Sequence, residues 1–310
     1  MSKATPISNR DLAVSISLML CSALSLSLVT FFAKQLTTFT ELSILIFIRS
    51  FIPFLILVWV SVILFDRKIN VSNARVHLLR AVFTVSSQYC LFYYLTHGSL
   101  LLGTLLFSTS GLFLPFISYI CFRKAIKTKT LIAVIISFIG VAFILNPKGN
   151  INLLMLIGLL AGFLNGCSQA TMHYCSKRSD TFSMTIIMYG LSSLYAFIIL
   201  ILLGKFSHLV SELSGNTATI EFWLIAILFS LFTITNQSLR VKAYRYVNNP
   251  TTLTPFFYTA ILFSGVLDWL VYHRVPLWNT YTGMIFIFIG GVIIAWRGNG
   301  KKTKCHPNRI

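Results

Sequence analysis

The stretch LDWLVYHRVPLWNTYTGMIFIFIGGVII (residues 267–294) decides the fold, because its pattern occurs twice in the chain. The stretch ISYICFRKAIKTKTLIAVIISFIGVAFI (residues 117–144) has the same succession of apolar run, polar turn and second apolar run, 150 residues earlier. In this register Phe138-Ile139-Gly140 aligns with Phe288-Ile289-Gly290. Two stretches of this kind predict an internal duplication.

The composition is typical of a membrane protein. Of the 310 residues, 56% are hydrophobic and 10% are charged, whereas a soluble domain carries roughly 25% charged residues. A chain this apolar cannot be wrapped around one aqueous core, so we expect several membrane-spanning helices. The net charge of +18 would suggest nucleic acid in a soluble protein, but in a membrane protein basic residues mark the cytoplasmic loops.

Runs of about 20 mainly apolar residues can cross a membrane as helices, and the sequence contains ten of them. They are residues 12–33, 41–65, 76–97, 99–122, 129–146, 152–174, 182–204, 220–239, 251–272 and 278–296. Of the 25 Lys and Arg residues, 20 fall on the side of the N-terminus, four fall on the other side, and Arg49 lies within the second run. This asymmetry predicts a multi-pass protein of the cell membrane (the inner membrane in a Gram-negative source) with both termini in the cytoplasm. It also argues against nucleic acid as a partner and favours contact of the basic clusters with anionic lipid headgroups at the cytoplasmic face.

Ten runs in two sets of five give two halves of opposite orientation, because five is odd. We therefore expect an all-α membrane protein with ten transmembrane helices in two inverted five-helix repeats. The repeats are residues 1–150 and residues 151–310, the second with a short basic C-terminal tail. Inverted repeats are typical of secondary transporters, whose substrate site lies near the membrane midplane between the halves.

Several short motifs occur in a characteristic order. The first half contains Lys34 and Arg49 at a spacing of 15, VHLLR (residues 76–80), and SFIGVAFILNP in the fifth run; the second half contains TLTPFFY, DWLVYHRVP and TGMIFIFIGG. Together they resemble the drug/metabolite transporter superfamily, EamA type, over nearly the whole chain. This resemblance implies ten helices, two inverted halves and small-molecule transport without an ATPase, and VHLLR is similar to the branch that handles S-adenosylmethionine. Family members usually carry Glu in the tight turn between the last two helices of each half, where this chain has Lys124 and Arg274.

Polar residues within the runs are the candidate site, because they are costly in a membrane unless they face protein or water. Arg49 either anchors carbonyls or a carboxylate, or forms a positive wall of a cavity. Arg80 opens the third run and either extends to the headgroups or belongs to a gate. Asp268, near the outer end of the ninth run, is either a partner for Arg274 or another cation, or a gate with Arg274.

The uncharged candidates for the substrate cavity lie on four of the runs. Asn165 and Gln169 share a polar stripe on the sixth run, which suits hydrogen bonds to a polar solute or to neighbouring helices. The others are Gln88, Tyr89, Tyr93, Asn236 and Tyr258, of which the tyrosines fit packing as well as binding. Amides, tyrosines and Arg49 suit a neutral or carboxylate-bearing metabolite better than a bare cation.

The function expected from these residues is a secondary transporter that moves a small polar organic metabolite by alternating access. The resemblance implies an amino acid, a nucleoside-type compound or an S-adenosylmethionine-like compound as the substrate. The alternatives are a non-transporting receptor or scaffold and a membrane-embedded lipid enzyme. An enzyme of that kind needs carboxylates or histidines at one membrane depth, which the sequence does not show. We expect no catalytic residues, cofactor or metal, and a homodimer is left open.

Overall fold

The computed structural model describes residues 9–62, 74–122, 128–145, 153–176, 179–214, 220–247, 250–273 and 278–296. The helices within these ranges are α1 (Asn9–Leu36), α2 (Leu42–Val60), α3 (Ala74–His97), α4 (Leu100–Ser108), α5 (Ser110–Phe122), α6 (Thr128–Leu145), α7 (Leu153–Ser176), α8 (Thr181–Leu202), α9 (Phe206–Ser214), α10 (Ile220–Tyr246), η2 (Pro250–Leu253), α11 (Thr254–Phe257), α12 (Thr259–Tyr272) and α13 (Trp278–Trp296). No strand occurs among the described residues.

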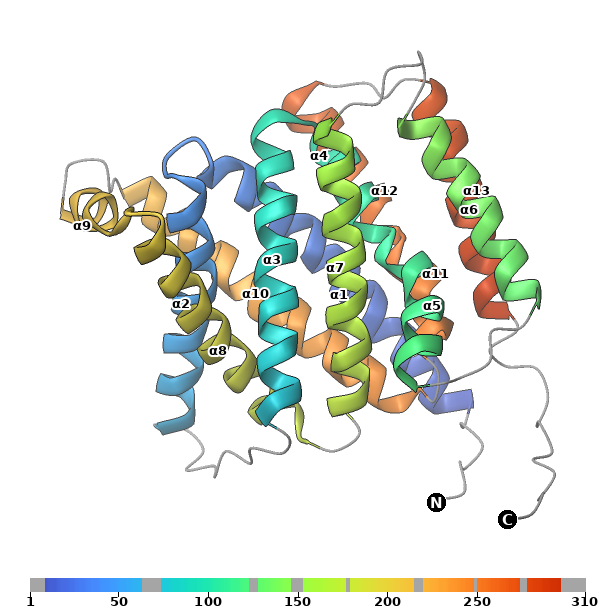
Figure 1. Cartoon of the computed structure of the whole chain (residues 1–310), viewed down its shortest axis with the longest axis horizontal. Coiled ribbons are helices and arrows are strands. Elements are labelled where there is room, and N and C mark those ends of the chain that lie inside the picture. The colour runs from blue at the N-terminus through green and yellow to red at the C-terminus, as the bar shows by residue number, and fades with distance from the viewer. Residues whose placement is uncertain are drawn as a thin grey trace.

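Each of the ten expected runs is occupied by one helix or by a broken one. Residues 99–122 form α4 and α5, and residues 251–272 form η2, α11 and α12. The described segments run alternately between two faces of the molecule (Figure 1). We call the face at which α1 begins and α13 ends the terminal face, and the opposite one the far face. The prediction of ten transmembrane helices in two inverted repeats is thus confirmed.

The apolar character of the helices agrees with this arrangement. Within the described part of the chain, six helices, counting α4 and most of α5 as one, are long and apolar enough to cross a membrane by length and composition, and α12 and the middle of α13 are shorter apolar helices. Large apolar side chains also point outward, as at Leu202 and Ile220, which are 79% and 83% exposed. Outward apolar side chains are expected where lipid is the solvent.

The packing of the helices reflects the inversion. In Figure 1, α1 lies along α10 and α3 lies along α7, and both pairs join the two halves. The first helix of each half therefore packs on the third helix of the other. The fifth helices, α6 and α13, form a pair at one end of the bundle, and the second helices, α2 and α8, pack together at the other end.

Glycine residues allow close approach at two helix contacts, one between α6 and α13 and one between α7 and the α4–α5 junction. A Cβ at Gly140 would lie 2.6 Å from the Gly283 carbonyl oxygen, so a side chain there would separate α6 from α13. On α7, Gly158, Gly162 and Gly166 lie at four-residue intervals and so share one face. A Cβ at Gly162 would overlap the carbonyl oxygen of Leu106. The backbone of α7 therefore lies directly against the junction of α4 and α5.

The fourth helix of each half is interrupted. Between α4 and α5 the Thr109 hydroxyl donates to the Leu106 carbonyl at 2.6 Å, and Pro115 provides no amide hydrogen for a carbonyl of the preceding turn. In the other half the interruption is at Tyr258, between α11 and α12, where the Ile261 amide bonds the Tyr258 carbonyl at 3.0 Å. Broken helices at membrane depth occur where neighbouring protein satisfies the released backbone groups.

Two features were not anticipated. Helix α9 is a short amphipathic helix near the far face (gold in Figure 1). Close to its start Lys205 forms an ion pair with Glu41 at 3.0 Å.

Helix α10 continues seven residues beyond the expected end at residue 239 and includes Arg240 and Arg245. The apolar run ends where the charged residues begin, but the helix continues through them.

Candidate functional site

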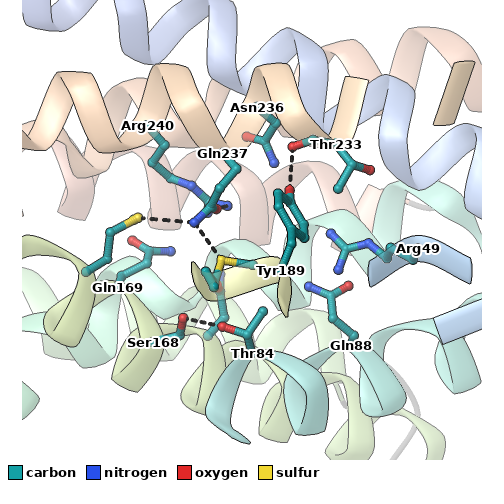
Figure 2. A pocket seen from close by; sticks show the side chains of 13 residues that line it. Arg49, Thr84, Gln88, Ser168, Gln169, Tyr189, Thr233, Asn236, Gln237 and Arg240 are labelled. Atoms are coloured by element: carbon teal, nitrogen blue, oxygen red, sulfur yellow. Dashed lines mark hydrogen bonds between the residues drawn. The ribbon is translucent and has the colours of Figure 1, made fainter. Parts of the chain in front are cut away.

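A small polar cavity lies inside the bundle between the two halves. Its lining comes from α2 and α3 of the first half and from α7, α8 and α10 of the second. Figure 2 shows Arg49 reaching in from α2 and Gln88 from α3, with Asn236 and Arg240 projecting from α10 on the other side of Tyr189. The volume open to the centre of a water molecule is about 20 Å³. A single water needs about 10–15 Å³ by this measure, so the described conformation is closed around the site.

Arginine side chains dominate the charge of this region. Arg49 and Arg240 line the cavity, and each is 7% exposed. Arg80, on α3, is 1% exposed and its Nη2 lies 3.5 Å from the sulfur of Met188, which itself lines the cavity. The three guanidinium groups thus come from three helices and surround one small volume.

Aromatic rings hold two of these guanidinium groups in place. The Arg49 guanidinium carbon lies 5.3 Å from the ring centre of Phe92 and 6.0 Å from that of Phe229. The Arg240 guanidinium carbon lies 5.6 Å from the ring centre of Phe257. Cation–π contacts of this length are favourable and are strengthened by desolvation.

The acidic side chains that the structure describes lie away from the cavity. The Glu41 carboxylate pairs with Lys205, Asp180 accepts a hydrogen bond from the Ser183 amide at 3.0 Å at the start of α8, and Asp11 and Glu221 lie in the first turns of α1 and α10. Asp66 and the side chain of Glu212 fall outside the described residues. Within the described part of the chain, the buried guanidinium groups therefore have no carboxylate beside them.

The amides of the cavity are partly engaged by neighbouring helices. The Asn165 and Gln169 side-chain amides both donate to the hydroxyl of Ser110, at 3.1 Å and 3.0 Å, and the Tyr244 hydroxyl donates to Gln169 Oε1 at 2.6 Å. Asn236 Oδ1 accepts a hydrogen bond of 2.7 Å from Ser22. These amides both line the cavity and join helices, so the two interpretations of this stripe are compatible.

Other lining groups differ in how well they are bonded. The Tyr189 hydroxyl donates to the Thr233 carbonyl at 2.9 Å, and the hydroxyls of Thr84 and Ser168 lie 2.7 Å apart. Gln88 Oε1 is buried and has no hydrogen-bond partner among the described residues. Gln88 therefore offers the cavity an unpaired acceptor.

The predicted site residues separate into two sets. Arg49, Gln88, Asn165, Gln169 and Asn236 line the cavity, and Arg80 lies directly behind it. The three tyrosines are not in the lining: Tyr89 packs partly buried on the core, Tyr93 is 43% exposed, and Tyr258 is buried in a separate apolar cluster.

Asp268 lies away from the cavity. Asp268 is 3% exposed, and its Oδ2 accepts a hydrogen bond of 3.2 Å from the Leu101 amide in the first turn of α4. A carboxylate at a helix N-terminus is stabilised by the unpaired amides and the helix dipole. Arg274, its expected partner, lies outside the described residues.

Sequence reasoning missed part of the lining. Arg240 follows the expected end of the eighth run at residue 239, and Gln237 lies two residues before that end, so the sequence places both near the terminal side of the membrane. Tyr189, Met172 and Met188 gave no signal, because tyrosine and methionine are common in helix packing.

Comparison with known proteins agrees with the geometry. The sequence profile of the EamA-like transporter family matches residues 13–146 and again residues 152–296. The chain belongs to the EamA-like transporter family. It is therefore a multi-pass membrane protein of the drug/metabolite transporter type, and the two matches correspond to the two halves of the bundle.

A likeness to solved structures supports the same fold. One of them, described only as a crystal structure of a protein, has a TM-score of 0.61 and 12% identity over 91% of this chain and 96% of its own. At this identity the likeness concerns the fold alone. No significant match was found among curated proteins.

Proposed function

We propose that this member of the EamA-like family is a secondary transporter that carries a small polar organic metabolite through the central cavity by alternating access. The observation that supports this is the position of the cavity: it is polar, buried among apolar helices, and lined from both inverted halves. Substrate sites of inverted-repeat transporters lie at such an interface between the halves.

The closed cavity has a consequence for the mechanism. A volume of about 20 Å³ is far smaller than ligand pockets, which are about 300–1,000 Å³. A metabolite therefore enters only after the helices around the cavity move apart. Helices α7 and α10 are joined near the terminal face by the Tyr244–Gln169 hydrogen bond of 2.6 Å, so opening toward that face requires this contact to break.

The orientation proposed for the protein places the terminal face in the cytoplasm. Arg75, Lys242 and Arg245 lie near the ends of α3 and α10 at this face, and basic residues favour the cytoplasmic side. A reporter fused after Ile310 would be active only in its cytoplasmic form if this orientation is correct.

Transport can be tested with purified protein in proteoliposomes and a pooled, isotope-labelled metabolite mixture. We expect one compound to accumulate in vesicles with wild type and less of it with Gln88→Ala. The matched control is Tyr93→Phe, on the same helix but 43% exposed and outside the lining, and it should transport as wild type does. Equal uptake by all three proteins would exclude the cavity as the route. Folded wild type that moves no compound would count against transport and favour a receptor or scaffold.

A further inference from the structure

The charge of the cavity narrows the chemistry of its ligand. Arg49, Arg80 and Arg240 are each at least nine-tenths buried in the membrane-spanning part of the bundle, and no described acid lies beside them. A buried ion without a counter-ion is strongly unfavourable, because it loses its hydration without gaining a partner. Three positive charges around one small volume therefore favour a negative ligand.

Hydrogen bonding leads to the same conclusion. Arg49 makes no hydrogen bond within the part of the chain that the structure describes, and Arg240 makes one long bond of 3.4 Å to Gln237 Oε1. Among the described residues, Arg80 donates only to the thioether sulfur of Met188. The Gln237 amide also donates to thioethers, at 2.9 Å to Met188 and 3.8 Å to Met172. Thioether sulfur is a weak acceptor, so the strong donors of the cavity lack strong acceptors.

The stacking of the arginines leaves their binding edges available. Cation–π contact uses the flat face of a guanidinium group, whereas its N–H groups point outward in the plane. The Nε atoms of Arg49 and Arg240 are buried and unpaired among the described residues. An edge of this kind matches the two oxygens of a carboxylate or phosphate group.

We propose that the cavity binds an organic anion, with its carboxylate or phosphate oxygens between Arg49 and Arg240. Arg80 adds positive charge from behind Met188, and Gln88 Oε1 accepts a hydrogen bond from a hydroxyl or amine of the same ligand. This inference deepens the proposed transport function and rests on it for the movement of the ligand. It favours anionic metabolites over S-adenosylmethionine-like cations.

Binding is tested by thermal unfolding of the purified full-length protein with chosen pairs of compounds. Succinate and glycerol 3-phosphate are the anionic probes, succinamide and glycerol are their neutral counterparts, and agmatine is the cationic probe. We expect at least one anion to raise the unfolding temperature of wild type, since a ligand that binds only the folded state stabilises it. A larger shift with succinate would identify a carboxylate site, and a larger shift with glycerol 3-phosphate a phosphate site. The proposal is overturned if neither anion stabilises the protein, or if a neutral or cationic compound does so equally.

Variants locate the site. Arg49→Gln and Arg240→Gln should each weaken binding of the stabilising anion at least tenfold. Arg245→Gln is the matched control, because it removes one positive charge from the same helix at an exposed position, and it should bind as wild type does. Equal weakening by Arg245→Gln would indicate a general charge effect and overturn the assignment.

The ligand-free unfolding temperature separates binding from a structural role. If Arg49 and Arg240 serve an anion, removing their charge relieves an unfavourable burial, so Arg49→Gln and Arg240→Gln should unfold at the same or a higher temperature than wild type. A lower temperature in both variants would make these residues structural anchors and overturn the proposal.

Uptake distinguishes failure of the site from failure of the function. An anion that stabilises wild type but does not enter proteoliposomes would leave the anion site standing and remove the transport proposal. Uptake of a neutral or cationic metabolite, unaffected by Arg49→Gln and Arg240→Gln, would leave transport standing and remove the anion site.

Discussion

Two buried polar regions of this protein differ in how completely they are hydrogen-bonded. The first, which we call the hydroxyl cluster, joins α1, α4 and α12 through Ser27, Thr30, Thr104 and Ser264, all 0% exposed. Ser27 donates to the Ala260 carbonyl at 2.8 Å, and Ser264 donates to the Thr104 hydroxyl at 2.9 Å. Thr104 in turn donates to the Leu100 carbonyl at 2.9 Å. Each hydroxyl in this cluster has a partner, and none carries a charge.

The central cavity is also buried, but it is charged and its groups are incompletely hydrogen-bonded. Its arginines bond thioethers or one distant amide oxygen, or make no hydrogen bond among the described residues. Neutral groups whose hydrogen bonds are all made hold helices together. Buried charged groups that lack hydrogen-bond partners cost free energy, and a ligand that pairs with them removes this cost. The contrast therefore separates groups that maintain the fold from groups that serve function, and each prediction below tests this separation.

The largest effect is expected from removing both lining arginines. Arg49→Gln with Arg240→Gln should reduce anion transport at least about 100-fold, because each hydrogen-bonded charge contributes on the order of 1.5–3 kcal/mol. Stability should not fall. Uptake and thermal unfolding measured on the same preparation check both parts. Loss of transport together with loss of folding would break the comparison, since the arginines would then resemble the hydroxyl cluster.

A large effect on the fold alone is expected at the seam between α7 and the α4–α5 junction. Gly162→Leu places a side chain where the Leu106 carbonyl and the Thr109 hydroxyl lie, so it should destabilise the protein by about 3 kcal/mol, the upper end of the usual overpacking cost. Unfolding in mixed detergent micelles measures this. Gly204→Ala is unsuitable as a control, because Gly204 has a positive φ of 68°. Ala196→Gly, a small change elsewhere in the bundle, is the control, and it should lower the free energy of unfolding by about 1 kcal/mol.

A moderate loss of stability is expected in the hydroxyl cluster. Thr104→Val removes the acceptor of the Ser264 hydroxyl and leaves that buried donor unsatisfied, which costs about 1–3 kcal/mol. Substrate affinity should be unchanged, because Thr104 does not line the cavity. Unfolding and uptake are again measured together, and a changed affinity at full stability would show that this cluster is not merely structural.

The smallest effect is expected near the terminal face. Tyr244→Phe deletes the hydrogen bond to Gln169 Oε1, worth about 0.5–1.5 kcal/mol net, and should favour opening on that side about two- to tenfold. The rate at which N-ethylmaleimide modifies the buried thiol of Cys175, followed by mass spectrometry, measures the opening. Tyr246→Phe, at an exposed position of the same helix, should leave the rate unchanged.

The bundle itself could be predicted from sequence because membrane thickness sets the length of each apolar run. Helix α9 could not, since nine residues of mixed character are too short to register as a span. The lining of the central cavity was predicted in part, and the differences are geometric. Depth was judged along an upright helix, but α10 has 27 residues and crosses the bundle obliquely in Figure 1. Arg240 therefore reaches the same cavity as Arg49.

The position of each residue around its helix explains why a predicted tyrosine does not line the cavity. Tyr89 lies about 100° around α3 from Gln88 and packs partly buried on the core instead of lining the cavity. Thr84 and Gln88, four apart, share the inward face and both line the cavity. The sequence contains this periodicity, but it does not say which face of α3 meets the other half.

The interruptions at Thr109 and Tyr258 occur in the fourth helix of each half, and the halves are inverted. In the alternating-access mechanism proposed above, a rearrangement at one junction that opens one face has a counterpart at the other junction that opens the opposite face. The two open conformations are then related by exchanging the shapes of the halves, and their energies differ only through the differences between the two half-sequences. A substitution near either junction that changes this difference by about 1.4 kcal/mol would alter the ratio of the two conformations tenfold. The direction in which the protein rests is thus set by the differences between the two half-sequences, because the inverted architecture favours neither direction.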